Sequence, residues 1–342
     1  MSDGTTGHPS GTADGHALDG AGVVELAVLE RSGLIESRHS GAAVVTDRSG
    51  AAVRTLGDAT ALVYPRSSLK PLQALAALRS GATLHDAQLV LATASHSGTP
   101  AHIDVVRTML ANAGLDESAL QTPADWPLDG ASHDALAAAG DHQRPLYMNC
   151  SGKHAAFLGS CVAQGWDTAG YLEPSHPLQQ LIREVVEEYT GETVTVTGID
   201  GCGAPVHAVT LAGMARATSL IARGLDGAGN PDEHAAALTA AVLANGWAID
   251  GPGRPNTVII DELGLFTKGG AEGYLIMAAP SGEAVAIKIL DGGHRVSTLV
   301  ALRLLADAGV IDADAAERVA ALATPSVTGG GRVVGAMRPA FD

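Results

Sequence analysis

The pattern of apolar and polar positions changes once near the start of the chain, close to Tyr64. From Val23 to Leu56, the short runs VVELAVLE, LIESRHSGAAVV and AAVRTL are separated by the turn sequences SG and DRSG, which is typical of antiparallel strands. Beyond Tyr64, apolar residues recur at helical spacing in LKPLQALAALRSG, DAQLVLATASHSG and PAHIDVVRTMLANAG, and each run ends near a Gly or Ser that can stop a helix. We therefore expect an antiparallel meander followed by a layer of helices.

The C-terminal half returns to strands. Helical spacing continues in HPLQQLIREVVEEYTG, APVHAVTLAGMARAT and DEHAAALTAAVLANG, with TVTVTGID as the one strand among them. GYLIMAAP and AVAIKILD predict a hairpin joined at SGE, followed by a helix from Val296 to Ala308. Strands at both ends predict an α+β fold in which the late hairpin pairs with the early meander in one antiparallel sheet flanked by helices.

The first residues differ from the rest of the chain. Residues 1–21 are rich in Gly, Thr, Asp and His without periodicity, so we expect a disordered leader there. Residues 22–342 are expected to form a single domain, since no internal linker or repeat interrupts them.

Composition narrows the possible partners and the compartment. The 342 residues include 21 Lys and Arg against 37 Asp and Glu, a formal net charge of −16, which disfavours binding to nucleic acid or to an anionic membrane. The chain has neither a signal-peptide pattern nor a long apolar stretch, so a cytoplasmic protein is expected. Three cysteines are too few for a disulfide framework and favour reduced thiols or metal ligands.

One short motif joins a nucleophile to a base. Ser67-Ser68-Leu69-Lys70 stands at the opening of a predicted helix, where the i, i+3 spacing places Ser67 and Lys70 on one face. A lysine activates such a hydroxyl only when it is neutral, which requires burial or a neighbouring cation. The alternative is structural, with Ser68 capping the helix and Lys70 solvated.

Two later segments strengthen the chemical interpretation. Ser95-His96-Ser97 and Lys268-Gly269-Gly270 follow in the order that is the signature of serine β-lactamases and penicillin-binding proteins. The second segment departs from that signature, because it lies only 25 residues after Lys70 and ends in Ser97 instead of Asn. Either Ser95 or Ser97 can serve as a proton relay, and a backbone N–H of the glycine pair can contribute to an oxyanion hole.

A second group of residues has the chemistry of a metal site. Cys150 and Cys202, each in a glycine-containing turn sequence, can supply two thiolates to Zn²⁺. Lys153, His154 and Asp200 are candidates for the remaining positions. The alternative is that both cysteines are small buried core residues.

Three arginines lie at positions that favour binding of a carboxylate. Arg66 precedes Ser67, and Arg254 and Arg295 lie in the glycine-rich loops GPGRPN and LDGGHRV. A guanidinium in such a loop suits bidentate binding of a carboxylate.

These motifs together resemble one known family. YPRSSLKPLQ, ASHSGTPAH, NCSGKHAAFL, TGIDGCGAPVHA, TKGGAEG and VTGGGRVVGAMRP resemble the asparaginase II family, the thermolabile, Rhizobium-type L-asparaginases. The resemblance implies a fold similar to serine β-lactamases, penicillin-binding proteins and serine-dependent glutaminases. It also implies a homodimer that hydrolyses the small-molecule substrate L-asparagine to L-aspartate and ammonia.

The resemblance also implies roles for individual residues. Its two Ser-Lys pairs fall on Ser67 with Lys70 and on Ser95 with Lys268, and its zinc site falls on Cys150, Lys153 and Cys202. We expect Lys70 to be the neutral base and a charged Lys268 to keep it neutral. The candidates for binding the substrate are Arg66, Asp200, His154 and Arg254.

Other functions use the same residues. A glutaminase or another serine amidase could use the same residues with a longer pocket. The one additional methylene of glutamine changes the binding free energy by only about 1–3 kcal/mol. From other classes, a zinc-dependent amidohydrolase would use a metal-bound water at Cys150 and Cys202, and a non-catalytic amino-acid-binding protein would use the pocket without chemistry.

Overall fold

The centre of the fold is an antiparallel sheet that joins the two ends of the chain. A computed structural model describes residues 15–342, and within them eight strands follow the order β11-β12-β1-β2-β10-β9-β8, with β3 also paired to β2. Their bounds are β1 (Val24–Arg31), β2 (Leu34–Thr46), β3 (Ala52–Leu56), β8 (Phe266–Gly270), β9 (Tyr274–Ala278), β10 (Ala284–Ile289), β11 (Val327–Gly329) and β12 (Arg332–Pro339). The predicted α+β fold is confirmed.

The pairing of the late hairpin with the early meander is also confirmed. β10 pairs antiparallel with β2 and with β9, so that Val44, Ala286 and Ile276 lie side by side on one face. Their neighbours Val45 and Val285 point to the opposite face, and residues of both faces are buried. The central strands therefore separate two hydrophobic cores, which explains why they are apolar at successive positions.

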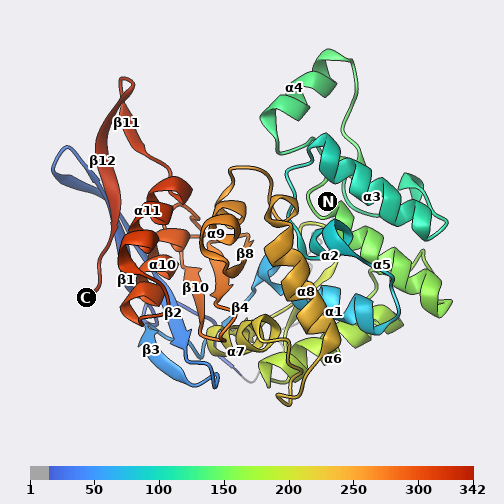
Figure 1. The fold of residues 1–342 in the computed structure, drawn as a ribbon, viewed down its shortest axis with the longest axis horizontal. Coiled ribbons are helices and arrows are strands. Elements are labelled where there is room, and N and C mark those ends of the chain that lie inside the picture. The colour runs from blue at the N-terminus through green and yellow to red at the C-terminus, as the bar shows by residue number, and fades with distance from the viewer. Residues whose placement is uncertain (1–14) are drawn as a thin grey trace, which may run out of the picture.

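Helices cover both faces of this sheet (Figure 1). α7 packs against β2, β9 and β10 on one face, whereas α10 packs against β9, β10 and β12 and is itself covered by α11. The helices have the bounds α1 (Lys70–Arg79), α2 (Asp86–Thr93), α3 (Pro100–Asn112), α4 (Gly130–Ala138), α5 (Ser151–Gln164), α6 (Pro177–Thr190), α7 (Leu211–Ala222), α8 (Glu233–Ala244), α9 (Pro255–Leu263), α10 (Ser297–Asp307) and α11 (Ala313–Ala323).

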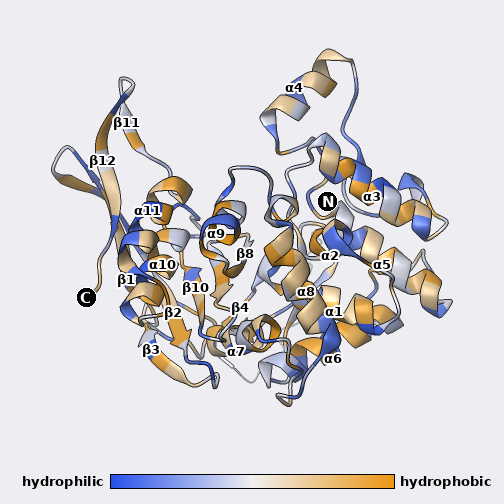
Figure 2. Ribbon diagram, in the orientation of Figure 1, coloured by the Kyte–Doolittle hydropathy of each residue, from blue (hydrophilic) through white to orange (hydrophobic). Residues whose placement is uncertain are grey.

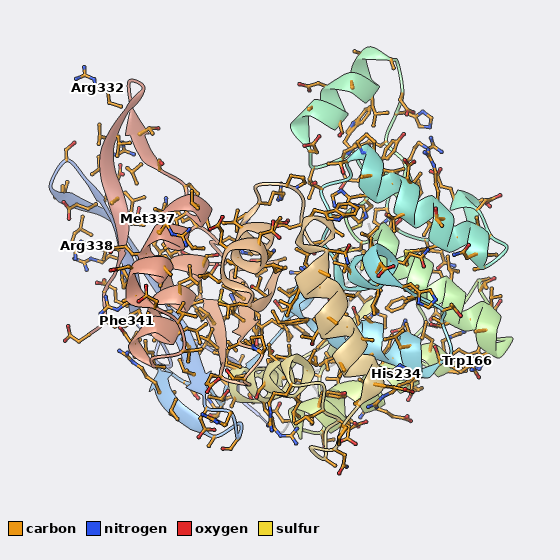
Figure 3. The ribbon with its side chains drawn as sticks, viewed as in Figure 1. Trp166, His234, Arg332, Met337, Arg338 and Phe341 are labelled. Carbon is orange, nitrogen blue, oxygen red and sulfur yellow. The ribbon has the colours of Figure 1, made fainter. Side chains whose placement is uncertain are left out.

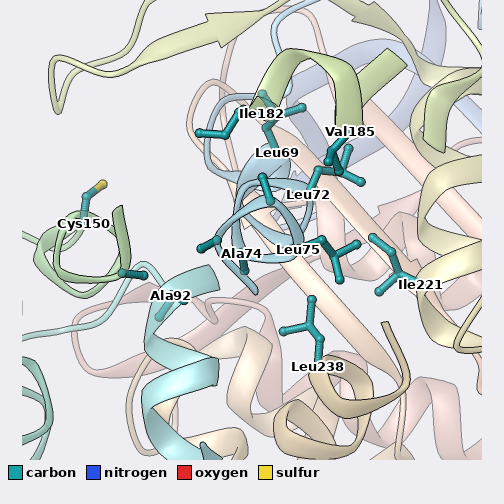
Figure 4. Packing of buried hydrophobic residues seen from close by; sticks show 14 of the residues in the cluster. Leu69, Leu72, Ala74, Leu75, Ala92, Cys150, Ile182, Val185, Ile221 and Leu238 are labelled. Atoms are coloured by element: carbon teal, nitrogen blue, oxygen red, sulfur yellow. The ribbon is translucent and has the colours of Figure 1, made fainter. Parts of the chain in front are cut away.

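Helix α1 is the centre of the helical region. Every residue from Lys70 to Ala77 is buried, because α1 is surrounded by α2, α5, α6 and α8. Figure 4 shows Leu72 and Leu75 of α1 packed among Ile182, Ile221 and Leu238. Peripheral helices such as α3 and α6 instead carry both hydrophobic and hydrophilic residues (Figure 2). The N-terminus of α1 is thus held rigidly at the boundary between helices and sheet.

The sequence misplaced some element boundaries. The predicted helix over residues 204–218 begins only at Leu211, since β6 (Pro205–His207) and β7 (Val209–Thr210) precede it. Pro205 disfavours helical conformation in the residue before it, and Thr210 caps α7 by accepting a hydrogen bond from Gly213 N. β6 pairs with β5 (Thr197–Ile199), the only part of TVTVTGID that is a strand, and β7 pairs with β4 (Leu62–Val63).

Part of the predicted leader is ordered. Residues 1–14 lie outside the described residues. Ala17, however, forms a β-bridge with Leu62, and Leu62 N donates to His16 O at 2.8 Å. The prediction of disorder is therefore wrong for residues 16–18, because their backbone bonds to the edge of β4.

The β11–β12 hairpin projects from the sheet, with Arg332 directed away from the body of the protein (Figure 3). Within residues 15–342, none of the helices combines the length and apolar character needed to cross a bilayer.

Candidate active site

Ser67 lies in a 3-10 turn, η1 (Arg66–Leu69), that leads directly into α1. Arg66 adopts a φ of +52°, a left-handed conformation that is rare for a residue with a side chain. Its Nε donates to Asp200 Oδ1 at 2.8 Å, so two of the predicted substrate-binding residues are paired with each other. Backbone strain of this kind persists where the surrounding structure fixes it, and it clusters at functional sites.

The predicted Ser-Lys pairs come together around one hydroxyl. Lys70 Nζ donates to Ser95 Oγ at 2.9 Å and to Ala94 O at 2.6 Å. Lys268 Nζ lies 3.0 Å from the same Ser95 Oγ. Ser95 therefore bridges two lysines from distant parts of the chain.

The two remaining serines differ from Ser95 in their surroundings. Ser67 lines the neighbouring cavity, and in the described structure its hydroxyl makes no hydrogen bond to Lys70. Such bonds are often long in a ligand-free site and tighten when substrate binds. Ser97 is buried without a hydrogen bond to either lysine within the described chain, so the geometry favours Ser95 as the relay.

Burial changes the acid–base chemistry of this site. Both Lys70 and Lys268 are buried, with exposed fractions of 1% and 0%. Burial, together with the charge of Lys70, lowers the pKa of Lys268 to about 7. Within the described residues, no carboxylate contacts the Lys268 ammonium to offset this desolvation. The expected positive charge of Lys268 stays a prediction.

The glycine pair after Lys268 explains how β8 approaches η1. A Cβ on Gly270 would lie 2.2 Å from Pro65 O and 3.0 Å from Ser68 N, so only glycine fits there. Ser68 Oγ donates to Lys268 O at 2.8 Å, which ties the two segments together. Ser68 is thus a structural link beside the candidate nucleophile.

Gly269 has a different role from the one predicted. Its N–H donates to Asn256 Oδ1 at 3.0 Å, so this N–H is already engaged and the prediction of an oxyanion donor is wrong for Gly269. Asn256 Nδ2 in turn donates to Asp250 Oδ2 at 3.0 Å, and Arg254 Nε donates to Asp250 Oδ1 at 2.9 Å. Sequence analysis missed Asn256 and Asp250, although Asp250 precedes the conspicuous turn GPGRPN and Asn256 is its last residue.

The predicted metal ligands also lie together. Lys153 Nζ is 3.1 Å from Cys202 Sγ, and a hydrogen bond with Cys202 followed by burial raises the pKa of the Cys150 thiol. The same bond from Cys150 lowers the pKa of Cys202 against the effect of burial. Burial alone would lower the pKa of Lys153, but the charges of Cys202 and Cys150 raise it.

His154 is adjacent to this sulfur pair. Its Nδ1 lies 2.8 Å from Tyr171 Oη, while its Nε2 is buried without a hydrogen-bond partner. Burial lowers the pKa of His154 to about 4, so the imidazole is neutral.

The donor set fits zinc through its sulfur atoms. Within the described residues, no group of three or more His, Cys, Asp or Glu side chains is arranged to hold a metal ion. Two buried thiols beside an amine nevertheless suit Zn²⁺, provided that Lys153 loses its proton.

The site opens into a cavity of about 540 Å³. Ser67, Ser95 and Lys268 line one part of it, and Arg254 and Arg295 line another. A larger cavity of about 660 Å³ lies between α10, α11 and β12, but it contains none of the site residues. The chemistry therefore favours the smaller cavity.

The chain is similar to a known protein family and to several solved structures. The sequence profile of the L-asparaginase II family matches residues 27–339, whereas no curated protein matches the chain. Among solved structures, the chain is similar to a β-lactamase from Mycobacterium bovis, with 18% identity over 78% of this chain and 94% of that one, at a TM-score of 0.44. It is also similar to a Bacillus glutaminase, with 11% identity over 79% and 90% of the two chains, at a TM-score of 0.39.

The family match covers nearly all of the described structure and includes every residue of the two Ser-Lys pairs and of the cysteine cluster. The chain belongs to the L-asparaginase II family.

Proposed function

We propose that this protein hydrolyses L-asparagine to L-aspartate and ammonia, with Ser67 as the nucleophile. The observation that carries the proposal is the Ser95 hydroxyl held 2.9 Å from Lys70 Nζ and 3.0 Å from Lys268 Nζ, beside a cavity that Ser67 lines. Buried amines in such a cluster supply the base that a serine nucleophile needs.

The reaction proceeds in two halves. Ser67 Oγ attacks the carboxamide carbon of the side chain while Lys70 Nζ accepts the hydroxyl proton. The C–N bond then breaks, the leaving nitrogen takes a proton through Ser95, and ammonia departs from an aspartyl ester on Ser67. Water hydrolyses the ester by the same proton route, which restores the serine and releases aspartate.

The two lysines contact one hydroxyl, that of Ser95. Burial together with the charge of Lys70 lowers the pKa of Lys268 to about 7, so Lys268 releases its proton more readily than an exposed lysine. In this proposal the Ser95 hydroxyl links the two amines, and Lys70 accepts the proton of Ser67.

The groups around Arg66 hold the rest of the substrate in this proposal. Asp200 accepts the α-amino group as a counter-charge, and its bond to Arg66 keeps both side chains beside Ser67. Arg254, which lines the same cavity as Ser67, contributes positive charge. These contacts favour a free amino acid over an internal residue of a peptide.

The family resemblance adds a zinc ion. Cys150, Lys153 and Cys202 would hold it, with Lys153 Nζ 3.1 Å from Cys202 Sγ. When bound, zinc supplies positive charge that orients the substrate's carboxylate. The side chains of the two Ser-Lys pairs perform the proton transfers.

Ammonia release tests the proposal. Ser67→Ala should lower kcat for asparagine by more than a thousandfold while the melting temperature changes by less than a few degrees. Ser80→Ala, at the opposite end of α1 where the hydroxyl donates only to Ala77 O, is the matched control and should keep its activity. Substantial turnover by Ser67→Ala would contradict the serine mechanism.

The same assay separates the alternatives. A panel with glutamine and other amides, each with and without a chelator, identifies the substrate. Faster turnover of glutamine would make the protein a glutaminase. If the chelator abolishes activity and Ser67→Ala keeps its activity, the protein is a zinc hydrolase. Binding without ammonia release would indicate an amino-acid-binding protein.

Two further parts of the proposal concern assembly and compartment. The family resemblance implies a homodimer, which sedimentation at micromolar concentration would show as twice the chain mass. Three free cysteines suit a reducing, cytoplasmic compartment.

A further inference from the structure

The candidate active-site cavity is much larger than the leaving group of an asparaginase requires. Its volume is about 540 Å³, whereas an ammonia molecule, close in size to water, needs about 30 Å³. Ser95 and Lys268, the residues that serve the leaving nitrogen under the proposed function, line this cavity. Asp200 and Cys202, on the side of the aspartyl group, are absent from its lining in residues 15–342. Under the proposed function, which places the aspartyl group at Asp200, the remaining volume of this cavity is available to a group attached to the leaving nitrogen.

The lining of the cavity carries more basic than acidic side chains. Its lining contains three Lys or Arg residues, Lys268, Arg254 and Arg295, and one acid, Asp250. In the whole chain the balance is reversed, with 21 Lys and Arg against 37 Asp and Glu. Asp250 forms its ion pair with Arg254, so Asp250 does not neutralise the charge of Arg295.

Arg295 is fixed by a neutral group. Its Nε lies 3.0 Å from His39 Nε2, and burial together with the charge of Arg295 lowers the pKa of His39. Asp291, an acid of this loop, lies 3.6 Å from His39 Nδ1, and burial lowers the pKa of the adjacent His294 although the charge of Glu272 opposes this shift. Within the described chain, no acidic side chain forms an ion pair with Arg295. The guanidinium is thus positioned and available to an anion.

Helix α10 begins at the same place. Ser297 and Thr298, its first residues, line the cavity. Thr298 is only 8% exposed, and in the described structure its hydroxyl has no hydrogen-bond partner, whereas Ser297 Oγ donates to His294 O. The unpartnered hydroxyl of a largely buried threonine, a helix N-terminus and a guanidinium held by His39 together form a suitable site for a carboxylate.

Resting on the proposed function, we propose that Arg295 and Thr298 bind a carboxylate on the leaving amine, so that the substrates include β-aspartyl amides of amino acids. In this reaction the Ser67 Oγ–carbon bond forms and the amide C–N bond breaks. The leaving amine takes its proton through Ser95 and departs as a free amino acid. Water then hydrolyses the aspartyl ester to aspartate.

A pair of substrates that differ by one carboxylate tests this inference. β-Aspartylglycine carries the group and N-methylasparagine lacks it, and release of glycine or methylamine is measured for each. The wild-type protein should favour β-aspartylglycine at least tenfold in kcat/KM. Arg295→Gln should reduce that ratio by about ten- to a hundredfold, and Thr298→Val by a few-fold. Arg303→Gln is the matched control, since Arg303 lies on the same helix but pairs with Asp307, and it should keep the ratio.

Binding provides a second readout that does not depend on turnover. Calorimetry with Ser67→Ala should show tighter binding of β-aspartylglycine than of N-methylasparagine, and adding Arg295→Gln should abolish the difference. If asparagine is not hydrolysed, the proposed function fails, and the calorimetry still decides the carboxylate site. Hydrolysis of asparagine without hydrolysis of β-aspartylglycine, or a preference that survives Arg295→Gln, would overturn the inference.

Discussion

Replacing Lys268 with methionine should stabilise the protein at neutral pH, because the wild-type side chain is buried at a cost. Lys268 is fully buried, and burial with the charge of Lys70 lowers its pKa from 10.5 to about 7. At about 1.4 kcal/mol per pH unit, this difference corresponds to about 5 kcal/mol of folding free energy. Catalytic groups are often destabilising in this way.

The sign of the pH dependence follows from proton binding. Below pH 7 the lysine is protonated in both the folded and the unfolded state, so the full penalty opposes folding. Between pH 7 and 10.5 the unfolded state binds the proton and the folded state does not, so wild-type stability rises with pH through the contribution of Lys268. The gain is about 2–3 kcal/mol between pH 7 and 9.

Methionine removes this titration together with two hydrogen bonds. The bonds from Lys268 Nζ to Ser95 Oγ and to Gly269 O are worth about 1 kcal/mol each, which offsets part of the gain. Lys268→Met should therefore be about 2 kcal/mol more stable than wild type at pH 7. Near pH 9 the advantage should vanish.

Urea unfolding at pH 7, 8 and 9 measures this difference directly. Lys153→Met is the matched control, because Lys153 is equally buried but its pKa is raised by the charges of Cys202 and Cys150 against the effect of burial. Its folded-state proton is retained over this range, so the stability difference between Lys153→Met and wild type should stay constant. A constant difference for Lys268→Met as well would refute the reasoning.

Three further predictions address the site. Because burial and the charge of Lys70 lower the pKa of Lys268 to about 7, kcat should rise as the pH passes 7 towards pH 8–9. Lys70→Arg should remove nearly all activity, and near-normal turnover would exclude lysine as the base. Cys202→Ser should lower zinc content, measured by emission spectrometry, and raise KM more than it lowers stability, whereas a metal-free protein with full activity would contradict the zinc proposal. Gly270→Ala should lower both the melting temperature and kcat, because its Cβ would lie 2.2 Å from Pro65 O. Gly269→Ala should be tolerated, because its Cβ would contact only Asn256, at 3.5 Å. Equal effects of the two substitutions would contradict this packing.

Sequence patterns predicted the sheet better than the helical region. The meander and the hairpin carry strong turn signals, and their pairing as β2 with β10 follows from the layering of an α+β fold. β8 was not predicted as a strand, because FTKGG ends in two glycines, which weaken any strand pattern. Its identity depends on tertiary contacts with β9 and η1.

The candidate site was predicted in its residue types but not in its bonding. The spacing of Ser67 and Lys70 indicated a direct pair, whereas the structure bonds Lys70 to Ser95. The spacing of apolar residues along the chain does not show which of the two lysines is more strongly desolvated. It also does not show which carboxylates lie too far from the lysines to contact them. Asp250 and Asn256 were missed for the same reason, since their role arises only when α9 and β8 pack together.

The identity of the nucleophile is tested most directly by trapping the covalent intermediate. Wild-type protein mixed with asparagine, quenched in acid within a turnover and digested with a protease should yield an aspartyl adduct on the peptide that contains Ser67. Ser95→Ala should retain this adduct on Ser67 because the relay, and not the nucleophile, is removed. An adduct on Ser95 in the wild-type protein, or rapid ammonia release without any adduct, would contradict the account.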